Sequence, residues 1–240
     1  MNKVIEISDR PNCDIIALSF PHPPTSINWS VFGIFHSDKN EDKLIVGSIE
    51  SGGRQQHWKF GVFPNEYNFR VSNAMLVYHK YQYHCLDVKG RLGKFEDPHG
   101  GDVTWNIVPR IGFKGLKLRA VNQTFLAAGE DGDIFAVVVS CDNTEVSVYK
   151  LDPFEFEWIP VENLRDRMLF LSETASFGAK ATRSAMGNKI YFPKFYGTSG
   201  VFYSLSTKKY RSYDGRFAAN EPYMLENMST ATWIQPYYPS

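Results

Sequence analysis

Short runs of β-branched and aromatic residues, separated by polar turns, recur along the whole chain. Five of these runs have the length and composition that strands favour: Lys43–Ile49 (KLIVGSI), Ile134–Ser140 (IFAVVVS), Glu145–Leu151 (EVSVYKL), Lys189–Phe192 (KIYF) and Gly200–Leu205 (GVFYSL). Only Glu162–Met168 has the pattern of a helical turn. The pattern therefore predicts an all-β protein.

Turn residues separate the strand-like runs at short and regular intervals. Asp131-Gly132 follows Thr124–Ala128, and Lys89-Gly90 follows Gln82–Asp87; a second strand-like run begins directly after each glycine. These pairs are typical of β-hairpins because glycine adopts the positive φ that tight turns need. The chain of 240 residues holds 18 Gly and 13 Pro, about one turn-forming residue in eight, which leaves little room for long helices.

A degenerate repeat of about 50 residues organises these strands. Large aromatic residues close successive units at Trp58, Trp105, Trp158 and Tyr210, at intervals of 47, 53 and 52 positions. This period is typical of kelch-like β-propellers, whose blades are four-stranded antiparallel sheets; a sandwich or an irregular barrel is the alternative. We predict one partial propeller domain over residues 1–240, with about four to five four-stranded blades and the three tryptophans buried between neighbouring blades.

The two ends of the chain are expected to meet. Within the single domain, residues 1–12 form an N-terminal segment, residues 215–229 a loop and residues 230–236 a closing strand. An unpaired strand at the edge of a sheet invites aggregation, so the closing strand needs a partner. We expect Lys3–Ser8 or Asp14–Ser19 to pair with it, and Trp233 to pack against that blade.

Several segments resemble, in their order along the chain, a known plant family. They are Met75–Tyr78, Tyr83–Gly93, Glu145–Leu151 followed by Trp158, Asp166–Leu171, Gly187–Phe192, Gly200–Leu205 and Thr232–Pro236. Over about residues 65–236 the chain is similar to the F-box-associated, KIB-type β-propellers. The resemblance implies a domain that selects the target protein in F-box ubiquitin-ligase complexes, or that binds a signalling partner directly.

The family usually carries an F-box, a three-helix module that binds a Skp-type adaptor, before the propeller. Met1–Asn12 (MNKVIEISDRPN) shows no such helices. A truncated member, an alternative gene product and a member that has lost the F-box all fit this pattern. We therefore expect no Skp-type adaptor to bind this chain by itself.

Two segments hold residues capable of binding metal ions. Gly129–Asp133 contains three carboxylates, but Ile134 begins an apolar strand where an EF-hand loop needs further oxygen ligands, so a charged hairpin turn is favoured. His79, His84 and Cys85 are close in sequence. In continuous strands the two histidines would lie on opposite faces, although a turn at 80–82 would change this, and a structural role is favoured.

Charge and cysteine usage narrow the function classes. With 26 basic and 26 acidic residues the net charge is zero, so the basic middle region is interpreted as a solvated face and not as a nucleic-acid surface; its residues are Arg54, Lys59, Lys80, Lys89, Arg91 and Lys94. Cys13, Cys85 and Cys141 suggest neither a disulfide framework nor a zinc site. With no apolar span of 18 residues and no signal-peptide pattern, an intracellular protein (cytoplasm or nucleus) without membrane contact is expected.

Two functions of different class remain open. The favoured hypothesis is a non-catalytic protein-interaction module, because a propeller displays variable loops on one face of a rigid ring. The alternative is a propeller-type enzyme with a metal or acid–base site in the central channel. No nucleophile signature or phosphate loop supports the alternative, so we predict no catalytic, cofactor or metal residues, and the protein-binding residues stay unknown.

Overall fold

The computed structural model describes residues 14–20, 30–36, 42–50, 58–65, 68–79, 82–87, 89–96, 104–108, 112–113, 121–142, 144–173, 175–193, 200–213, 218–219 and 233. Strands dominate these residues, and the described helical structure is one short turn, η2 (Ser184–Met186). No helix in the described ranges is long and apolar enough to cross a membrane. The prediction of an all-β protein is confirmed.

The first two sheets are antiparallel meanders of four strands each. The first sheet contains β1 (Asp14–Ser19), β2 (Ser30–His36), β3 (Lys43–Glu50) and β4 (Lys59–Pro64). The second contains β5 (Val71–His79), β6 (Gln82–Asp87), β7 (Leu92–Glu96) and β8 (Thr104–Val108). In both sheets each strand pairs with the next strand along the chain.

The third sheet has ten strands and joins two further meanders through an inserted hairpin. The third meander contains β9 (Val121–Gly129), β10 (Ile134–Ser140), β11 (Val146–Leu151) and β12 (Trp158–Pro160). The fourth contains β15 (Lys189–Phe192), β16 (Val201–Ser204), β17 (Lys209–Ser212) and β18 (Ala218–Ala219). The hairpin of β13 (Arg167–Phe170) and β14 (Phe177–Lys180) lies between them, with β14 parallel to β9 and β13 parallel to β15.

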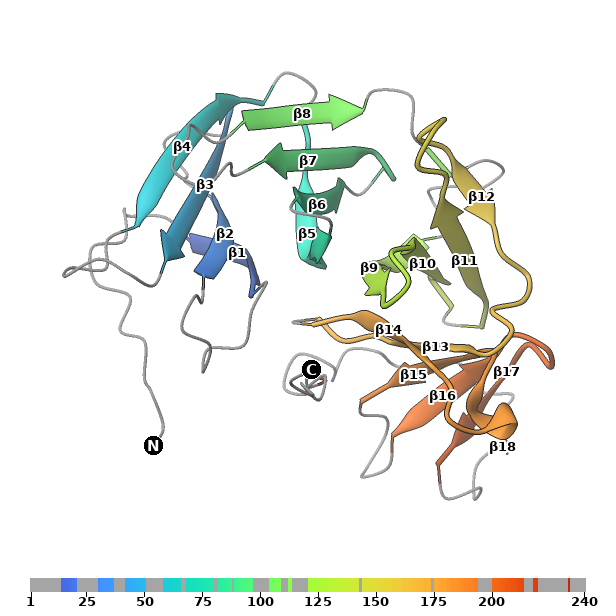
Figure 1. Ribbon diagram of the computed structural model, residues 1–240. Coiled ribbons are helices and arrows are strands. Elements are labelled where there is room, and N and C mark those ends of the chain that lie inside the picture. Colours follow the sequence, from blue (N-terminus) through green and yellow to red (C-terminus); the bar gives the residue numbers. More distant parts are fainter. Residues whose placement is uncertain are drawn as a thin grey trace.

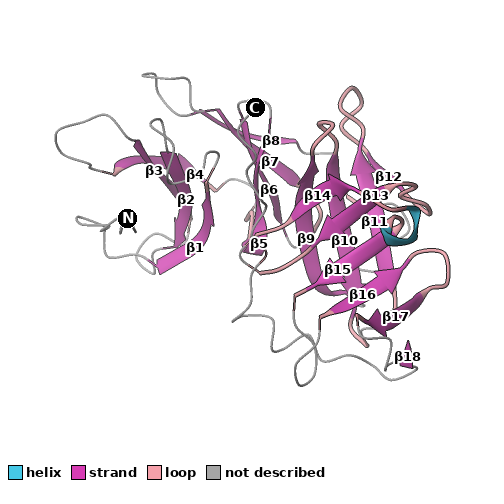
Figure 2. Cartoon of the chain, turned by 60° about the horizontal axis from the view of Figure 1, so that its bottom comes forward, coloured by secondary structure: helices cyan, strands magenta, loops and turns pink. Residues whose placement is uncertain are grey.

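The meanders are arranged around an arc, as the blades of a propeller are. In Figure 1 the first strand of each meander lies toward the centre of the arc and the last strand lies toward its rim. The inner strands β1 and β5 contact each other, as do β5 and β9. Figure 2 shows the strand groups side by side from a second direction. The predicted propeller is thus present, although its third and fourth units share one continuous sheet.

Aromatic residues fill the spaces between the meanders, as the repeat predicts. Trp158 is buried in the core cluster between the second and third meanders, beside Leu92 and Leu126. Trp105 is half-buried and stacks on Phe95 in the cluster between the first and second sheets. The position of Trp58 differs from the prediction: it is buried, but every described residue of its cluster belongs to the first sheet.

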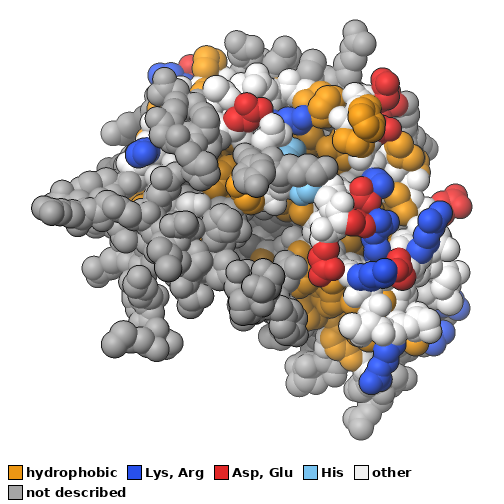
Figure 3. Space-filling model, in the orientation of Figure 1, with side chains coloured by type: hydrophobic (Ala, Val, Ile, Leu, Met, Phe, Trp, Pro, Cys, Tyr) orange, Lys and Arg blue, Asp and Glu red, His pale blue; other side chains and the backbone are white. Residues whose placement is uncertain are grey.

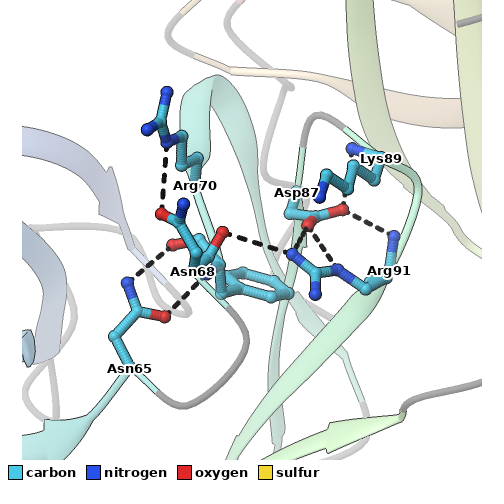
Figure 4. Close-up of polar contacts among 7 residues, drawn as sticks. Asn65, Asn68, Arg70, Asp87, Lys89 and Arg91 are labelled. Atoms are coloured by element: carbon cyan, nitrogen blue, oxygen red, sulfur yellow. Dashed lines mark hydrogen bonds and ion pairs between the residues drawn. The ribbon is translucent and has the colours of Figure 1, made fainter. Parts of the chain in front are cut away.

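A buried aspartate fixes the turn between β6 and β7. Asp87 is 0% exposed; its Oδ1 accepts the backbone N–H groups of Lys89 and Arg91 at 2.8 and 2.7 Å. Its Oδ2 accepts Arg91 Nε at 2.6 Å, and Arg91 Nη2 also donates to the Asn68 carbonyl at 3.2 Å (Figure 4). The pair therefore ties this turn to the connection between the first two sheets.

The predicted helical turn at Glu162–Met168 is wrong. Arg165 has a φ of 58°, which a right-handed helix does not allow, and β13 begins two residues later at Arg167. A single turn is closed by the Arg167 N–H and the Leu164 carbonyl, while the Leu164 N–H donates to Asn188 Oδ1 at 2.9 Å. Burial of Leu164 in the core prevails over local helix propensity.

The expected neighbour of Trp233 also needs correction. Its ring packs edge-on against Phe170 of β13, at 5.0 Å between ring centroids, and its Nε1 donates to the Leu171 carbonyl at 3.1 Å. The contact is thus with the inserted hairpin, whose half-buried aromatic residue offers apolar surface beside an accepting carbonyl. Lys3–Ser8 and the rest of the predicted closing strand lie outside the described residues, as does the predicted loop at 215–229 except for β18.

Candidate functional site

Charged side chains gather where the inserted hairpin meets the third meander (Figure 3). The turn after β9 provides Glu130, Asp131 and Asp133, and β13 begins with Arg167. The turn is the hairpin predicted from Asp131-Gly132: Gly132 has a φ of 87°, and the Gly132 N–H donates to the Gly129 carbonyl at 3.0 Å. It is therefore a charged hairpin, as the sequence analysis favoured over a calcium loop.

One arginine joins this turn to the inserted hairpin. The Arg167 guanidinium forms an ion pair with Asp131 and lies 3.2 Å from Asp133 Oδ2. Asp133 also pairs with Lys150 of β11 at 2.8 Å. Burial raises the pKa of Asp131, but the hydrogen bond and charge of Arg167, together with backbone N–H groups, outweigh it and hold that pKa below its ordinary value.

These residues border a groove of about 230 Å³. We define the charged groove by its lining residues: Gly129, Glu130, Asp131, Asp166, Arg167, Gly178, Ala179 and Lys180. Lys180, the direct partner of Arg167 on β14, has its Nζ 3.4 Å from Asp166 Oδ2, and the side chains of Lys180 and Asp166 are mostly exposed. The groove thus offers both signs of charge within one small concave surface.

Two glycines bring the strands on either side of the groove together. Gly129 of β9 and Gly178 of β14 are direct partners in the parallel pairing. A Cβ atom at Gly178 would lie 3.2 Å from the Gly129 Cα, so no larger residue fits there without widening the pair. The close approach sets the distance between the Asp131 turn and the start of β13, on which the ion pair depends.

The two histidines singled out in the sequence lie on one face of the second sheet. His84 pairs with Val77 across the strands, and His79 lies two residues beyond Val77, so both side chains project from the same face. Their ring centroids are 6.2 Å apart, while Cys85 projects into the core on the opposite face. Within the described part of the chain, no three His, Cys, Asp or Glu side chains are placed to hold a metal ion.

His84 is buried next to other basic groups. Desolvation, helped by the charges of Lys94 and His79, lowers its pKa from 6.5 to about 4, so the ring is neutral at neutral pH. Lys94 Nζ lies 3.6 Å from the centre of the Phe156 ring, and burial lowers its pKa despite the opposing charge of Glu96. These groups belong to the packing between the second and third meanders.

The basic middle region does not form one surface. Arg91 is bound to Asp87, Lys94 is half-buried against Phe156, and Lys59 and Lys89 are exposed on different sheets. Arg54 and Lys80 lie outside the described residues. The charged groove was not predicted as a site because Asp131 and Arg167 are 36 positions apart in the sequence. The Asp-Gly turn and the Asp166-Arg167 pair were visible, but only the parallel pairing of β14 with β9 brings them together.

The comparison with known families agrees with this architecture. The family model described as KIB1-4 beta-propeller matches residues 11–214, which covers all four meanders except the two residues of β18. No curated protein matches the sequence. The antiparallel meanders form an arc, and their inner strands are in contact around its centre. Because the family model also matches most of the length, we conclude that the chain belongs to the KIB1-4 β-propeller family.

Proposed function

We propose that this propeller is a non-catalytic protein-interaction domain and that the charged groove contacts its target. Family resemblance suggests the class of target: a protein selected for ubiquitylation, as plant F-box proteins with such propellers select theirs. We do not expect a Skp-type adaptor to bind this chain by itself. The observation that carries the proposal is the groove itself, in which Arg167 and Lys180 alternate with carboxylates.

The composition of the groove suits recognition of a protein segment. Its charged side chains can exchange their mutual ion pairs for pairs with a partner, and exposed pairs of this kind contribute only about 0–1 kcal/mol to stability. Such charges fix the register of a bound segment and exclude partners with the wrong charge pattern. The carboxylates of Asp131 and Asp166 in the lining are already paired with cations, an arrangement that suits exchange of ion pairs with a binding partner.

The test is quantitative affinity capture from a plant extract, followed by binding measurements with the purified target. We expect Arg167→Glu combined with Lys180→Glu to weaken target binding by at least about tenfold, because both cations of the groove change sign. Lys43→Glu combined with Lys59→Glu makes the same charge change on the first sheet and is expected to leave binding within about twofold. A target bound equally well by both double variants would contradict the proposal.

An intracellular location is proposed alongside this function. Cys85 is a buried free thiol, and the three cysteines of the sequence suggest no disulfide framework, a usage typical of reducing compartments. Imaging of a fluorescent fusion of the chain in plant cells tests it, and signal confined to the secretory pathway would contradict it.

A further inference from the structure

One face shared by the inserted hairpin and the fourth meander carries a row of aromatic side chains. Phe177, Phe170, Tyr191 and Phe202 are direct neighbours across β14, β13, β15 and β16. We call these four residues the aromatic row. Their ring centroids are 5.1, 5.0 and 5.9 Å apart from one strand to the next. The row therefore crosses four strands without a break.

This row points away from the core. Ile190, Phe192, Val201 and Tyr203 belong to the core cluster between the third and fourth meanders. Side chains alternate between the two faces of a strand, so the aromatic row lies on the other face. Phe170, Phe177 and Phe202 are only partly buried there, Tyr191 is 9% exposed, and Tyr213, which stacks over Phe202, is 46% exposed.

Basic residues border the row on its outer side. Arg211 of β17 is the direct neighbour of Phe202, so it continues the row by one strand. The adjacent register position places Lys189, Ser204 and Lys209 side by side on the same face. Lys189 Nζ lies 4.3 Å from the centre of the Phe202 ring, and burial together with the charge of Arg211 lowers its pKa. The face thus combines apolar area with positive charge.

These cations differ from those of the charged groove. Arg167 and Lys180 are already paired with aspartates, whereas none of the ion pairs between described residues involves Lys189, Lys209 or Arg211. Lys209 and Arg211 are exposed and can pair with an incoming carboxylate without breaking an ion pair to another described residue. Trp233 already shows how an aromatic side chain from elsewhere packs on the row, with its ring on Phe170, the second member of the row, and its Nε1 on the Leu171 carbonyl.

We propose that this face binds an extended segment of a partner protein that carries carboxylates beside aromatic side chains. The aromatic side chains of the segment pack on the row, and its carboxylates pair with Lys209 and Arg211. The charged side chains of the groove take no part, so the inference goes beyond the function proposed above. It makes this face of the inserted hairpin and the fourth meander a second contact surface, and the charge complementarity selects an acidic segment.

The test uses a fluorescein-labelled peptide with two acidic residues before each of three aromatic residues, and fluorescence anisotropy with the full chain. We expect Lys209→Ser combined with Arg211→Ser to weaken binding by about tenfold or more, and Phe202→Ser to do the same by removing the end of the row that lies beside the cations. Lys43→Ser combined with Lys59→Ser is the matched control and should change the Kd by less than about twofold. Circular dichroism verifies that each variant is folded.

Three outcomes would overturn the proposal. Equal binding of an acidic peptide without aromatic residues would show that the face recognises charge alone. Tighter binding of a short single-stranded oligonucleotide than of the peptide would show that the face binds phosphate groups. Binding of the peptide to Trp233→Ala but not to the unmodified chain would show that the C-terminal residues of the chain itself occupy the face. The Arg167→Glu and Lys180→Glu variant should bind the peptide normally, which separates this inference from the proposed function.

Discussion

The indole Nε1 of Trp158 donates a 3.0 Å hydrogen bond to the carbonyl oxygen of Gly90, although the two residues are 68 positions apart. The bond joins the start of β12 in the third meander to the β6–β7 turn of the second. Gly90 has a φ of 80°, and a Cβ atom there would lie 2.7 Å from the Phe113 ring. Glycine is therefore required, because only it combines this backbone conformation with the close approach of Phe113.

Replacing Trp158 by phenylalanine is expected to lower the free energy of unfolding by about 1–3 kcal/mol, because the Gly90 carbonyl loses its buried donor. Trp105→Phe is the control, since Trp105 is only half-buried. Urea denaturation followed by circular dichroism measures both. Equal stability losses in the two variants would show that ring volume, and not the hydrogen bond, carries the effect.

Removing the Asp87 carboxylate is expected to lower the free energy of unfolding by about 3–5 kcal/mol, since it leaves Arg91 and two backbone N–H groups without their acceptor. The variant is Asp87→Ala, measured by thermal and urea unfolding. Asp152→Ala is the comparison, because Asp152 accepts the backbone N–H groups of Phe154 and Glu155 in an exposed turn. A larger loss for Asp152→Ala than for Asp87→Ala would contradict this account.

His84 should make the protein less stable in mild acid. Its pKa is 6.5 in the unfolded chain and about 4 in the folded protein, so the unfolded state takes up the proton first as the pH falls. The stability that depends on neutral His84 is present above pH 6.5 and is lost between pH 6.5 and about 4, up to about 3 kcal/mol. Unfolding free energies at pH 7 and pH 5 measure this.

The change in unfolding free energy between pH 7 and pH 5 should be smaller in His84→Gln than in the unmodified chain. His36→Gln, whose side chain is exposed, is the control and should keep this change. His79 faces His84, and its charge helps to lower the pKa of His84, so His79→Gln is measured alongside. An equal change in His84→Gln and in the unmodified chain would refute the assignment.

Gly178→Ala is expected to destabilise the protein by about 1–3 kcal/mol, because the added methyl group meets the Gly129 Cα and Leu169 and pushes β14 away from β9. At Gly112 an added methyl group makes only an ordinary contact, 3.9 Å from the Lys89 carbonyl oxygen. Gly112→Ala should therefore change the stability by less than about 0.5 kcal/mol. Equal melting temperatures for the two variants would contradict the described spacing of β9 and β14.

Local signals in the sequence were sufficient to predict most of the strands and turns named above. The apolar run Ile134–Ser140 has no competing pattern, and it forms β10 over the same residues. Asp131-Gly132 needs only its own backbone preference to turn the chain. The repeat of aromatic residues at the end of each unit indicated the propeller because its spacing follows from the size of one meander. The family match confirms that the chain is a β-propeller.

The features that the sequence did not reveal depend on pairing between distant residues. The segment Phe177–Lys180 (FGAK) is too short and too small in its side chains to predict a strand, yet it pairs with β9 and creates the charged groove. The aromatic row likewise requires the register in which Phe170 meets Tyr191. His79 and His84 were assigned to opposite faces for continuous strands, but the chain reverses between β5 and β6 and brings them together.

The inserted hairpin has a consequence for how the molecule opens. Among the described strands, the first and second sheets share no backbone ladder with a neighbouring sheet, and side-chain packing and the hydrogen bond of Trp158 to Gly90 hold them in place. The third and fourth meanders are joined through β13 and β14 by continuous backbone hydrogen bonds. Native-state hydrogen exchange should therefore find the amides of β9, β10 and β15 in one cooperative unit with the slowest exchange, while β2 and β3 exchange through a separate and more frequent opening.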